Sequence, residues 1–334
     1  MSNKIVTVGI WKNAPFRTAL FAGIDRVNEF LKEENLDLSY EAVLVDDAKL
    51  SSSPSKVQDI LFLDGGEDVN PSRYKEENKY STFSNARDIA EYKLIEHFYG
   101  FGKKLSGVCR GHQILNVFFG GSLYQDIRRD GVMNPRHLDS HRGGHKVRLK
   151  RLTKVMSKNK RGHVLSRFTG INPFTVSSMH HQAVKKLGSG LGISLVFGST
   201  KNSPHYIIEG IESANSRVRG IQSHPEFNGY SKDGLIFSYL LHVDDFVDGI
   251  LDPDFSAIEK KLKERNIKTT VPFDVEIMSH GQSSTGRVNS LGRELRSGLG
   301  REIIETVSRT GTRIDTEPVL DVYPDFTDGE FVEE

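Results

Sequence analysis

Cysteine is almost absent from this sequence: among 334 residues there is one, Cys109. A single cysteine excludes a disulfide within the chain, and this composition is typical of a reducing compartment, so we expect a cytoplasmic location. Long apolar runs are also missing, and none approaches the ~20 residues that a membrane-spanning helix needs. The apolar run near the N-terminus is interrupted at Asn13 and Arg17, too early for a secretory signal, so we expect no membrane partner.

A strong net charge of either sign is missing as well. The 45 Lys and Arg residues nearly balance the 44 Asp and Glu residues, which leaves a formal charge of +1. No global field therefore favours nucleic acid as a partner. Residues 141–161 are rich in Lys and Arg but lack interleaved aromatic residues, so they fit a solvated hairpin better than a nucleic-acid groove. An acidic protein partner, or the acidic residues 315–334 of this chain, is the alternative for this basic run.

What the sequence does contain is an alternation of short β-branched runs with amphipathic stretches. This alternation indicates βαβ units, and hence an α/β fold with a mostly parallel central sheet flanked by helices. The first strands are expected at residues 5–10, 40–45, 59–63 and 104–108, and the helices at 15–34, 87–98 and 112–119. Further short strands are expected at 174–178, 193–197, 206–211 and 218–221, with a closing apolar helix at 235–247.

The composition changes near residue 252, which predicts a domain boundary. We expect a folded domain at residues 1–252 and a polar C-terminal extension at residues 253–334. Within the extension, residues 279–300 are rich in Gly and Ser, and residues 315–334 are acidic. Such segments bury too little apolar surface to offset the entropy of ordering, so we expect the extension to be partly disordered or dependent on a partner.

The single cysteine stands in the pattern Gly107-Val108-Cys109-Arg110-Gly111, between an expected strand and an expected helix. A nucleophile at such a turn is exposed at the carboxyl end of the sheet, and small flanking residues let the neighbouring elements approach. The N-terminus of the following helix favours the thiolate over the thiol. The pattern is short, however, and a buried inert cysteine at a glycine turn is equally compatible with it.

His224 is the candidate proton carrier, because it follows the expected strand at 218–221 and so also falls at a strand end. A neutral imidazole can accept a thiol proton and return it to a leaving amine. An extended His224-Pro225-Glu226 segment would put the imidazole and the carboxylate on similar bearings, so that Glu226 could fix the tautomer. Taken alone, this stretch is also compatible with a surface turn.

A glycine pair follows the expected strand at 59–63. Gly65 and Gly66 can present backbone N–H groups to a developing oxyanion, and a plain turn is the alternative.

Three histidines with a spacing of four, His137, His141 and His145, could align as metal ligands on a helix. Gly143 and Gly144 argue against a helix there, so we interpret the three as polar loop residues and predict no metal site. No P-loop or dinucleotide fingerprint is present, and no organic cofactor is predicted.

Taken together, these patterns resemble a known family. The chain is similar to the γ-glutamyl hydrolase branch of the class I glutamine amidotransferases, specifically the γ-glutamyl-γ-aminobutyrate hydrolase (peptidase C26) group. The resemblance covers about residues 60–250, and the only cysteine falls on the family's nucleophile position. The matching stretches come in the family's order: GGEDVNPSRY at 65–74, RDIAE at 87–91, GVCRGHQILNVFFGGSLYQDI at 107–127, HHQAV at 180–184 and GIQSHPE at 220–226.

The resemblance implies a flavodoxin-like α/β fold and a Cys-His-Glu triad, which carries a small-molecule γ-glutamyl amide through a thioester and releases glutamate. No metal or organic cofactor is implied. The residues that take the family's roles are Cys109, His224 and Glu226 for the triad, the backbone N–H groups of Gly66 and Arg110 for the oxyanion hole, and Gln113, His181 and Gln182 for the glutamyl pocket.

Three functions stay open at this point. The protein is a free-standing γ-glutamyl hydrolase, a glutaminase that delivers ammonia to a separate synthetase subunit, or a catalytically silent binding or assembly module, and a homo-oligomer is open in each case. Leu105-Ser106, Ser177 and residues 36–47 depart from the family's usual pattern. The leaving amine is therefore not predicted.

Overall fold

The computed structural model describes residues 3–132, 143–149, 164–170, 173–200 and 203–246, all within one compact unit, Met1–Phe273. The predicted extension at 253–334 and the boundary near residue 252 lie outside the described residues. Most of the basic run lies outside them too, as do His137 and His141. Among the described residues, no helix combines the length and the apolarity needed to span a bilayer.

The central sheet is parallel, as predicted from the alternating pattern. Its strands lie in the order β2-β1-β3-β4-β11, and each neighbouring pair is parallel. This is the doubly wound order 2-1-3-4-5 of the flavodoxin-like fold, which confirms the predicted fold class. The strands are β1 (Lys4–Trp11), β2 (Leu38–Val45), β3 (Ile60–Leu63), β4 (Lys104–Val108) and β11 (Val218–Ile221).

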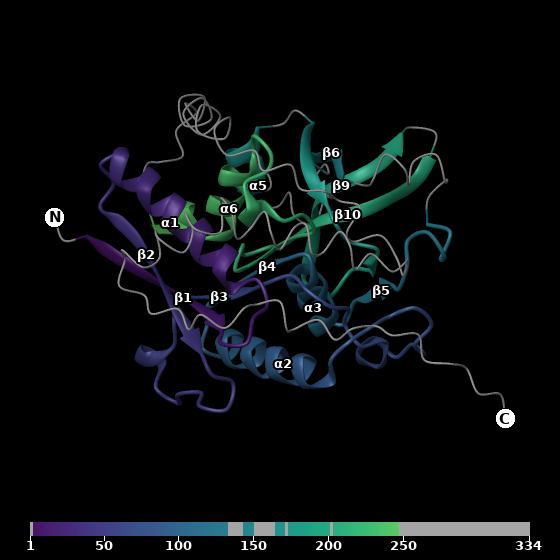
Figure 1. The fold of residues 1–334 in the computed structure, drawn as a ribbon, viewed down its shortest axis with the longest axis horizontal. Coiled ribbons are helices and arrows are strands. Elements are labelled where there is room, and N and C mark those ends of the chain that lie inside the picture. The colour runs from purple at the N-terminus through teal and green to yellow at the C-terminus, as the bar shows by residue number, and fades with distance from the viewer. Residues whose placement is uncertain (1–2, 133–142, 150–163, 171–172, 201–202, 247–334) are drawn as a thin grey trace, which may run out of the picture. The chain divides into compact units, whose positions relative to one another are not determined.

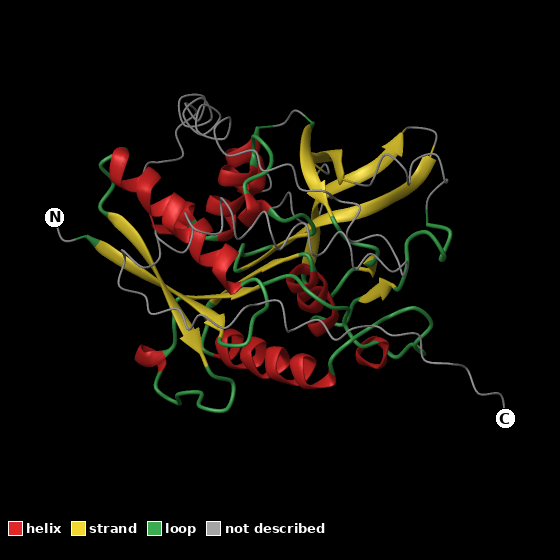
Figure 2. Ribbon diagram, viewed as in Figure 1, coloured by secondary structure: helices red, strands yellow, loops and turns green. Residues whose placement is uncertain are grey.

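An antiparallel extension continues the sheet beyond β11. The strand β10 pairs antiparallel with β11 and β9, and β9 is followed by β6 and β7. Figure 2 draws the strands of the sheet in yellow. Two short strands, β5 and β8, pair with each other and branch from β10. The bounds are β5 (Ser122–Tyr124), β6 (Gly143–Leu149), β7 (Phe174–Ser178), β8 (Ala183–Lys186), β9 (Leu191–Thr200) and β10 (Ser203–Ser213).

Helices cover both faces of the parallel sheet (Figure 1). One face packs against α1 (Arg17–Glu33), α5 (Val164–Thr169), α6 (Asp233–Leu240) and α7 (Val243–Phe246), with Phe62 of β3 and Phe237 of α6 stacked at a centroid distance of 5.3 Å. The other face packs against α2 (Asn85–Gly100) and α3 (Arg110–Phe118). Short 3-10 turns complete the described elements: η1 (Pro54–Lys56), η2 (Pro71–Tyr74) and η4 (Pro225–Phe227).

The closing helix expected at 235–247 is wrong as a single element, because the structure divides it into α6 and α7. His242 lies between them with a left-handed φ of 54°. The last carbonyls of α6 are bound by side chains from the sheet: Ser106 Oγ donates to Leu240 O at 2.6 Å, and Arg219 Nη1 donates to Tyr239 O at 2.7 Å. These donors satisfy the orphan carbonyls of the helix end, so the chain turns there and does not continue.

Candidate functional site

Cys109 forms the turn between β4 and α3. Its backbone has φ 48° and ψ −106°, a conformation that costs a non-glycine residue on the order of 1–3 kcal/mol. Two hydrogen bonds hold the backbone of the turn: Cys109 N donates to Ile221 O at 2.9 Å, and Gln113 N donates to Cys109 O at 3.1 Å. Cys109 is buried, with 7% of the residue exposed. A cysteine on a strained turn at the N-terminus of a helix is the arrangement that the sequence predicted, and its role as nucleophile stays a prediction.

The two flanking glycines are required by close approach. A Cβ at Gly107 would lie 2.4 Å from the backbone carbon of Gly111, and a Cβ at Gly111 would lie 2.3 Å from the carbonyl oxygen of Leu63. The same close approach allows Gly111 N to donate to Asp64 O at 3.0 Å. The turn at Cys109 is therefore packed against the loop that follows β3.

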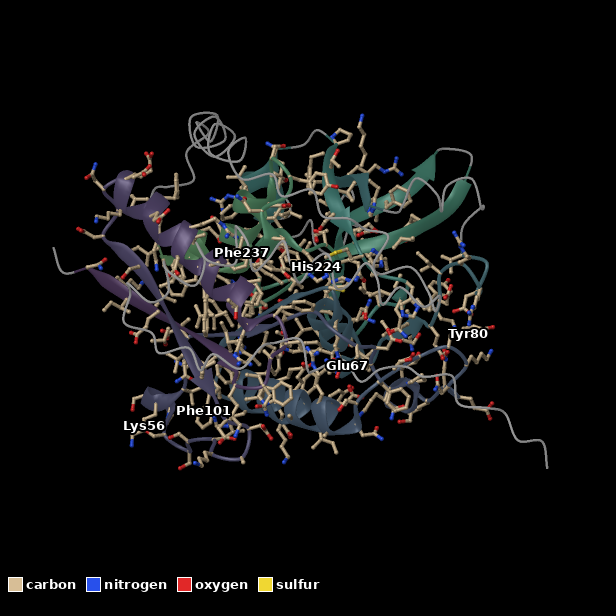
Figure 3. The ribbon with its side chains drawn as sticks, viewed as in Figure 1. Lys56, Glu67, Tyr80, Phe101, His224 and Phe237 are labelled. Carbon is tan, nitrogen blue, oxygen red and sulfur yellow. The ribbon has the colours of Figure 1, made fainter. Side chains whose placement is uncertain are left out.

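His224 and Glu226 come together beside this turn. Nδ1 of His224, which Figure 3 labels, lies 2.6 Å from Oε1 of Glu226. Both side chains are buried. The extended His-Pro-Glu segment expected from the sequence is wrong, because Pro225 opens the 3-10 turn η4 and His224 caps it. A proline at the first helical position is pre-set for such a turn, and the turn brings imidazole and carboxylate together.

The environment of His224 favours its charged form. Burial alone would lower its pKa, but the carboxylate of Glu226 and then the Cys109 sulfur outweigh burial and raise the pKa of His224 well above its usual 6.5. Because Nδ1 is engaged by Glu226, Nε2 is the ring nitrogen left for the sulfur. The backbone N–H of His224 donates to Ser177 Oγ at 2.9 Å, a contact that the sequence analysis did not predict.

Two aromatic rings enclose the imidazole. Phe227 stacks on His224 at a centroid distance of 5.2 Å, and Phe16 meets it edge-on at 6.0 Å. The backbone of Gly65 closes a further side, since a Cβ there would lie 2.6 Å from Cε1 of the ring. These contacts exclude water from the imidazole and restrict its rotation.

The predicted oxyanion donors, Gly66 and Arg110, follow the ends of β3 and β4, which are neighbouring parallel strands. Arg110 is the first residue of α3, where backbone N–H groups have no partner within the helix. Gly66 has a left-handed φ of 136°. Within the part of the chain that the structure describes, neither N–H group donates to another residue. Their role as oxyanion donors stays a prediction.

Beneath these two residues lies a buried charge cluster that sequence reasoning missed. Arg87 binds Asp64 at 2.8 Å, Glu67 at 2.6 Å and Glu91 at 2.7 Å. Arg110 binds Glu91 and Asp88. The sequence contains one signal for this cluster, the stretch RDIAE on the expected helix, but the sequence analysis assigned that stretch no role.

Asp64 ties this cluster to the first loop of the fold. Its Oδ2 accepts from Phe16 N at 2.8 Å, while its Oδ1 binds Arg87. Burial raises the pKa of Asp64 to about 6, against the attraction of Arg87. The residue therefore connects the loops that follow β1 and β3 with α2.

The residues predicted for the glutamyl pocket divide into two groups. Gln113 and Gln182 are brought together: Nε2 of Gln113 donates to Gln182 O at 3.2 Å and to Gln222 Oε1 at 3.1 Å, and all three are buried. Gln222 is an additional polar residue here, and it lies inside the quoted GIQSHPE stretch without having been singled out.

His181 belongs to a separate contact, with two carboxylates. Its Nε2 lies 2.9 Å from Asp68 Oδ1 and its Nδ1 lies 3.6 Å from Asp126 Oδ2, with 35% of the side chain exposed. Burial opposes the charge, but Asp68 and then Asp126 outweigh burial and raise the pKa of His181. No described contact joins His181 to Gln113.

His145 is not a loop residue, which corrects the sequence interpretation. It lies buried in β6, with Nε2 at 3.1 Å from Oε1 of the equally buried Glu209 on β10. Alternation along the strand turns His145 inward, and Val147 is buried on the same face.

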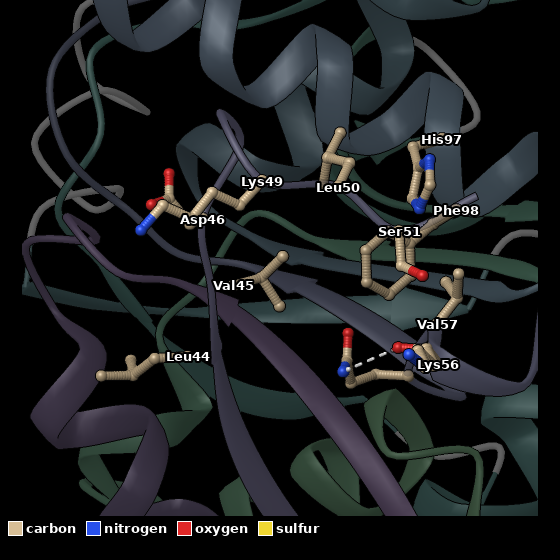
Figure 4. A pocket seen from close by; sticks show the side chains of 11 residues that line it. Leu44, Val45, Asp46, Lys49, Leu50, Ser51, Lys56, Val57, His97 and Phe98 are labelled. Carbon is tan, nitrogen blue, oxygen red and sulfur yellow. Dashed lines mark hydrogen bonds between the residues drawn. The ribbon is translucent and has the colours of Figure 1, made fainter. Parts of the chain in front are cut away.

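A surface hollow of about 260 Å³ lies elsewhere (Figure 4). It is lined by the end of β2, by side chains within residues 46–58, and by His97 and Phe98 of α2. Cys109, His224 and Glu226 do not line it, so we assign it no part in the candidate site.

The fold and this arrangement define the class of protein: an α/β protein with a cysteine on a strand-to-helix elbow and a His–Glu pair at the next strand end. The chain belongs to the peptidase C26 family, whose sequence profile matches residues 43–226. That range is more than half of the chain and contains Cys109, His224 and Glu226. The family places the chain among hydrolases related to the glutamine amidotransferases.

Two relatives in sequence agree with this assignment. A candidate glutamine amidotransferase of Schizosaccharomyces pombe is 36% identical over 187 residues, which is 53% of this chain and 64% of that protein. The protein NtpR of Enterococcus hirae is 32% identical over 189 residues, 55% of this chain and 74% of its own length. The chain thus spans somewhat less than two thirds of the first relative. A solved glutamine amidotransferase from Thermotoga maritima aligns with 79% of this chain and 99% of its own at a TM-score of 0.43 and 18% identity.

Proposed function

We propose that this protein hydrolyses the γ-glutamyl amide bond of glutamine or of a γ-glutamyl amine, with Cys109 as nucleophile. The observation that carries the proposal is the strained turn at Cys109 beside a buried His224–Glu226 pair joined at 2.6 Å. Backbone strain at a functional side chain is costly to the fold and is found where chemistry requires it. A Cys–His pair oriented by a third group is the arrangement of an activated nucleophile.

The reaction has two halves. The Cys109 sulfur attacks the γ-carbonyl carbon, its proton passes to Nε2 of His224, and the negative charge that develops on the carbonyl oxygen is held by the N–H groups of Gly66 and Arg110. The carbon–nitrogen bond then breaks, and His224 protonates the leaving ammonia or amine. This leaves a γ-glutamyl thioester on Cys109.

The second half returns the enzyme to its starting state. A water molecule gives a proton to His224 as it attacks the thioester carbon, the carbon–sulfur bond breaks to release glutamate, and His224 returns the proton to the Cys109 sulfur. Glu226 holds the imidazole in one tautomer and stabilises its charged form throughout. The reaction needs no metal or organic cofactor.

Gln113, Gln182 and His181 are the residues we propose for binding the glutamyl group. The first two support this role by their burial beside Gln222. His181 is favoured by its partial exposure and its raised pKa, which suit a charged contact with the substrate. We further propose a cytoplasmic location, from the single cysteine.

A second function, delivery of ammonia to a separate synthetase, is favoured by the amidotransferase name of the first relative. The test of both functions is glutamate release from glutamine and from a panel of γ-glutamyl amines, for the wild type and for Cys109→Ala. Release that disappears in Cys109→Ala supports the proposal, and a preference for glutamine over the amines favours ammonia delivery. Undiminished release by Cys109→Ala, or none by the wild type, would contradict hydrolysis by Cys109.

A further inference from the structure

We propose that Arg87 and Glu91 are positioning residues that hold the two backbone donors of the oxyanion hole at a fixed separation. This inference rests on the proposed function, because it assigns these residues a part in the same reaction. A backbone N–H has no side chain to aim it, so two donors from different loops need a rigid frame. The contacts of α2 supply that frame.

Arg87 binds the loop that carries Gly66. Its Nη2 donates to the carbonyl oxygen of Gly65 at 2.7 Å as well as to Asp64, and its Nη1 binds Glu67. The residues on both sides of the Gly66 donor are thus bound to one guanidinium. The guanidinium also lies directly against Gly66, where a Cβ would be 2.1 Å from Nη1.

Glu91 connects Arg87 to Arg110, the residue that follows the Cys109 turn. Its Oε1 accepts from Arg87 Nε at 2.7 Å, and its Oε2 accepts from Arg110 Nη1. Arg110 is the residue whose backbone N–H is the second predicted donor. A continuous path of charged hydrogen bonds therefore runs from Gly65 O through Arg87 and Glu91 to Arg110.

The helix α2 makes this path stiff. Arg87 and Glu91 are spaced four residues apart on α2, so their side chains lie on one face, and Asp88 on the same helix binds the other arm of Arg110. All four residues are at most 2% exposed. Forked guanidinium–carboxylate contacts fix direction as well as distance, which a single point charge would not do.

Stability alone does not account for the cluster. Buried ion pairs recover their desolvation cost only with good geometry, and apolar residues of similar size often stabilise a core as well or better. A second buried pair in this fold serves as a comparison: Arg219 binds Asp244 at 2.7 and 3.0 Å and joins β11 to α7. That pair touches neither Gly66 nor Arg110.

The experiment compares Glu91→Gln and Arg87→Lys with the control Asp244→Asn. Gln keeps the size of Glu91 but turns an N–H₂ donor toward one of its two arginine partners, and Lys keeps the charge of Arg87 but loses the fork. We expect kcat for glutamate release to fall about 100- to 1,000-fold in both variants with KM little changed, the effect of losing one oxyanion donor. We expect Asp244→Asn to lose stability but to keep kcat within about threefold of the wild type.

Two further readouts separate positioning from collapse. Alkylation of Cys109 by iodoacetamide forms no carbonyl oxyanion, so it should stay within about twofold of the wild type in Glu91→Gln. Amide hydrogen exchange of the segment 64–69 should become faster in Glu91→Gln and stay unchanged in Asp244→Asn.

Two outcomes would overturn the inference. One is unchanged kcat with unchanged exchange at 64–69. The other is an equal fall in kcat and alkylation, which indicates loss of the folded site. If the wild type releases no glutamate, the proposed function fails, and the exchange measurement alone decides whether Arg87 and Glu91 hold the loop.

Discussion

Gly65 offers a direct steric test of the position of His224. A methyl group at residue 65 would lie 2.6 Å from Cε1 of the imidazole and 3.5 Å from each ring nitrogen. Carbon atoms in contact are normally about 3.5–4.0 Å apart, so Gly65→Ala forces the ring to move by about 1 Å. Gly65 is not among the described glycines with a positive φ, so alanine adds no backbone strain there.

Three contacts restrict the movement of the ring. Glu226 holds Nδ1 at 2.6 Å, Phe227 stacks on one face and Phe16 meets the ring from another side. A displacement therefore weakens the contact with Glu226 or with Cys109. Because a misplacement of about 1 Å at a reacting group costs about 100-fold in rate, we expect kcat to fall by that factor. We also expect slower alkylation of Cys109 at neutral pH, since the thiol loses its proton acceptor.

Glutamate release and iodoacetamide alkylation measure both effects. The matched control is Gly100→Ala, at the last residue of α2, where a Cβ meets no atom within 4 Å. We expect this control to keep wild-type rates. A Gly65→Ala variant with kcat and alkylation both within about threefold of the wild type would refute the packing of His224 described here.

Three further predictions concern stability. Burial raises the pKa of Asp233 from 3.8 to about 7, so the folded state takes up this proton first and loses stability as pH rises through that range. Asp233→Asn should remove up to about 4 kcal/mol of this dependence of the unfolding free energy on pH, as measured by thermal unfolding at several pH values. Equal slopes of unfolding free energy against pH in the two proteins would contradict this. Ser177→Ala leaves the His224 N–H without its acceptor and should cost about 1–3 kcal/mol in urea unfolding, whereas an unchanged midpoint speaks against the contact. Gly111→Ala places a Cβ 2.3 Å from Leu63 O and should cost about 3 kcal/mol, and a smaller loss than at Ser177 would show that the elbow can relax.

Much of the fold was predictable because its first half is built from local patterns. The β-branched runs gave β1, β3 and β4 to within a residue or two, and their alternation with helices gave the parallel sheet. The antiparallel half was harder, since β6 joins the rest of the sheet through β9, which is distant in sequence, and β7 then pairs with β6 at the edge. The break between α6 and α7 depends on Ser106 and Arg219, and no pattern within residues 235–247 records those partners.

The candidate site shows the same division. Cys109, His224 and Glu226 fall in short motifs at strand ends, so the sequence could point to all three. Arg87 could not be recognised as a buried residue, because on an amphipathic pattern it is typical of the solvated face of a helix. Its partner Asp64 is 23 residues away, and that distance is bridged only by the packing of α2 on β3.

The topology explains why these segments meet. The strands β1, β3, β4 and β11 are parallel, so the residues that follow them converge on one edge of the sheet: Phe16, the Asp64–Gly66 loop, Cys109 and His224. At that edge the fold contains a strained cysteine, buried charges and four glycines at which a Cβ would clash, namely Gly65, Gly66, Gly107 and Gly111. Each of these weakens the fold when taken alone, and apolar residues in ordinary conformations would satisfy the core equally well. Their concentration at one edge is what the proposed hydrolysis of an amide would require, because that reaction needs a fixed sulfur, a fixed imidazole and two fixed N–H groups at the same point.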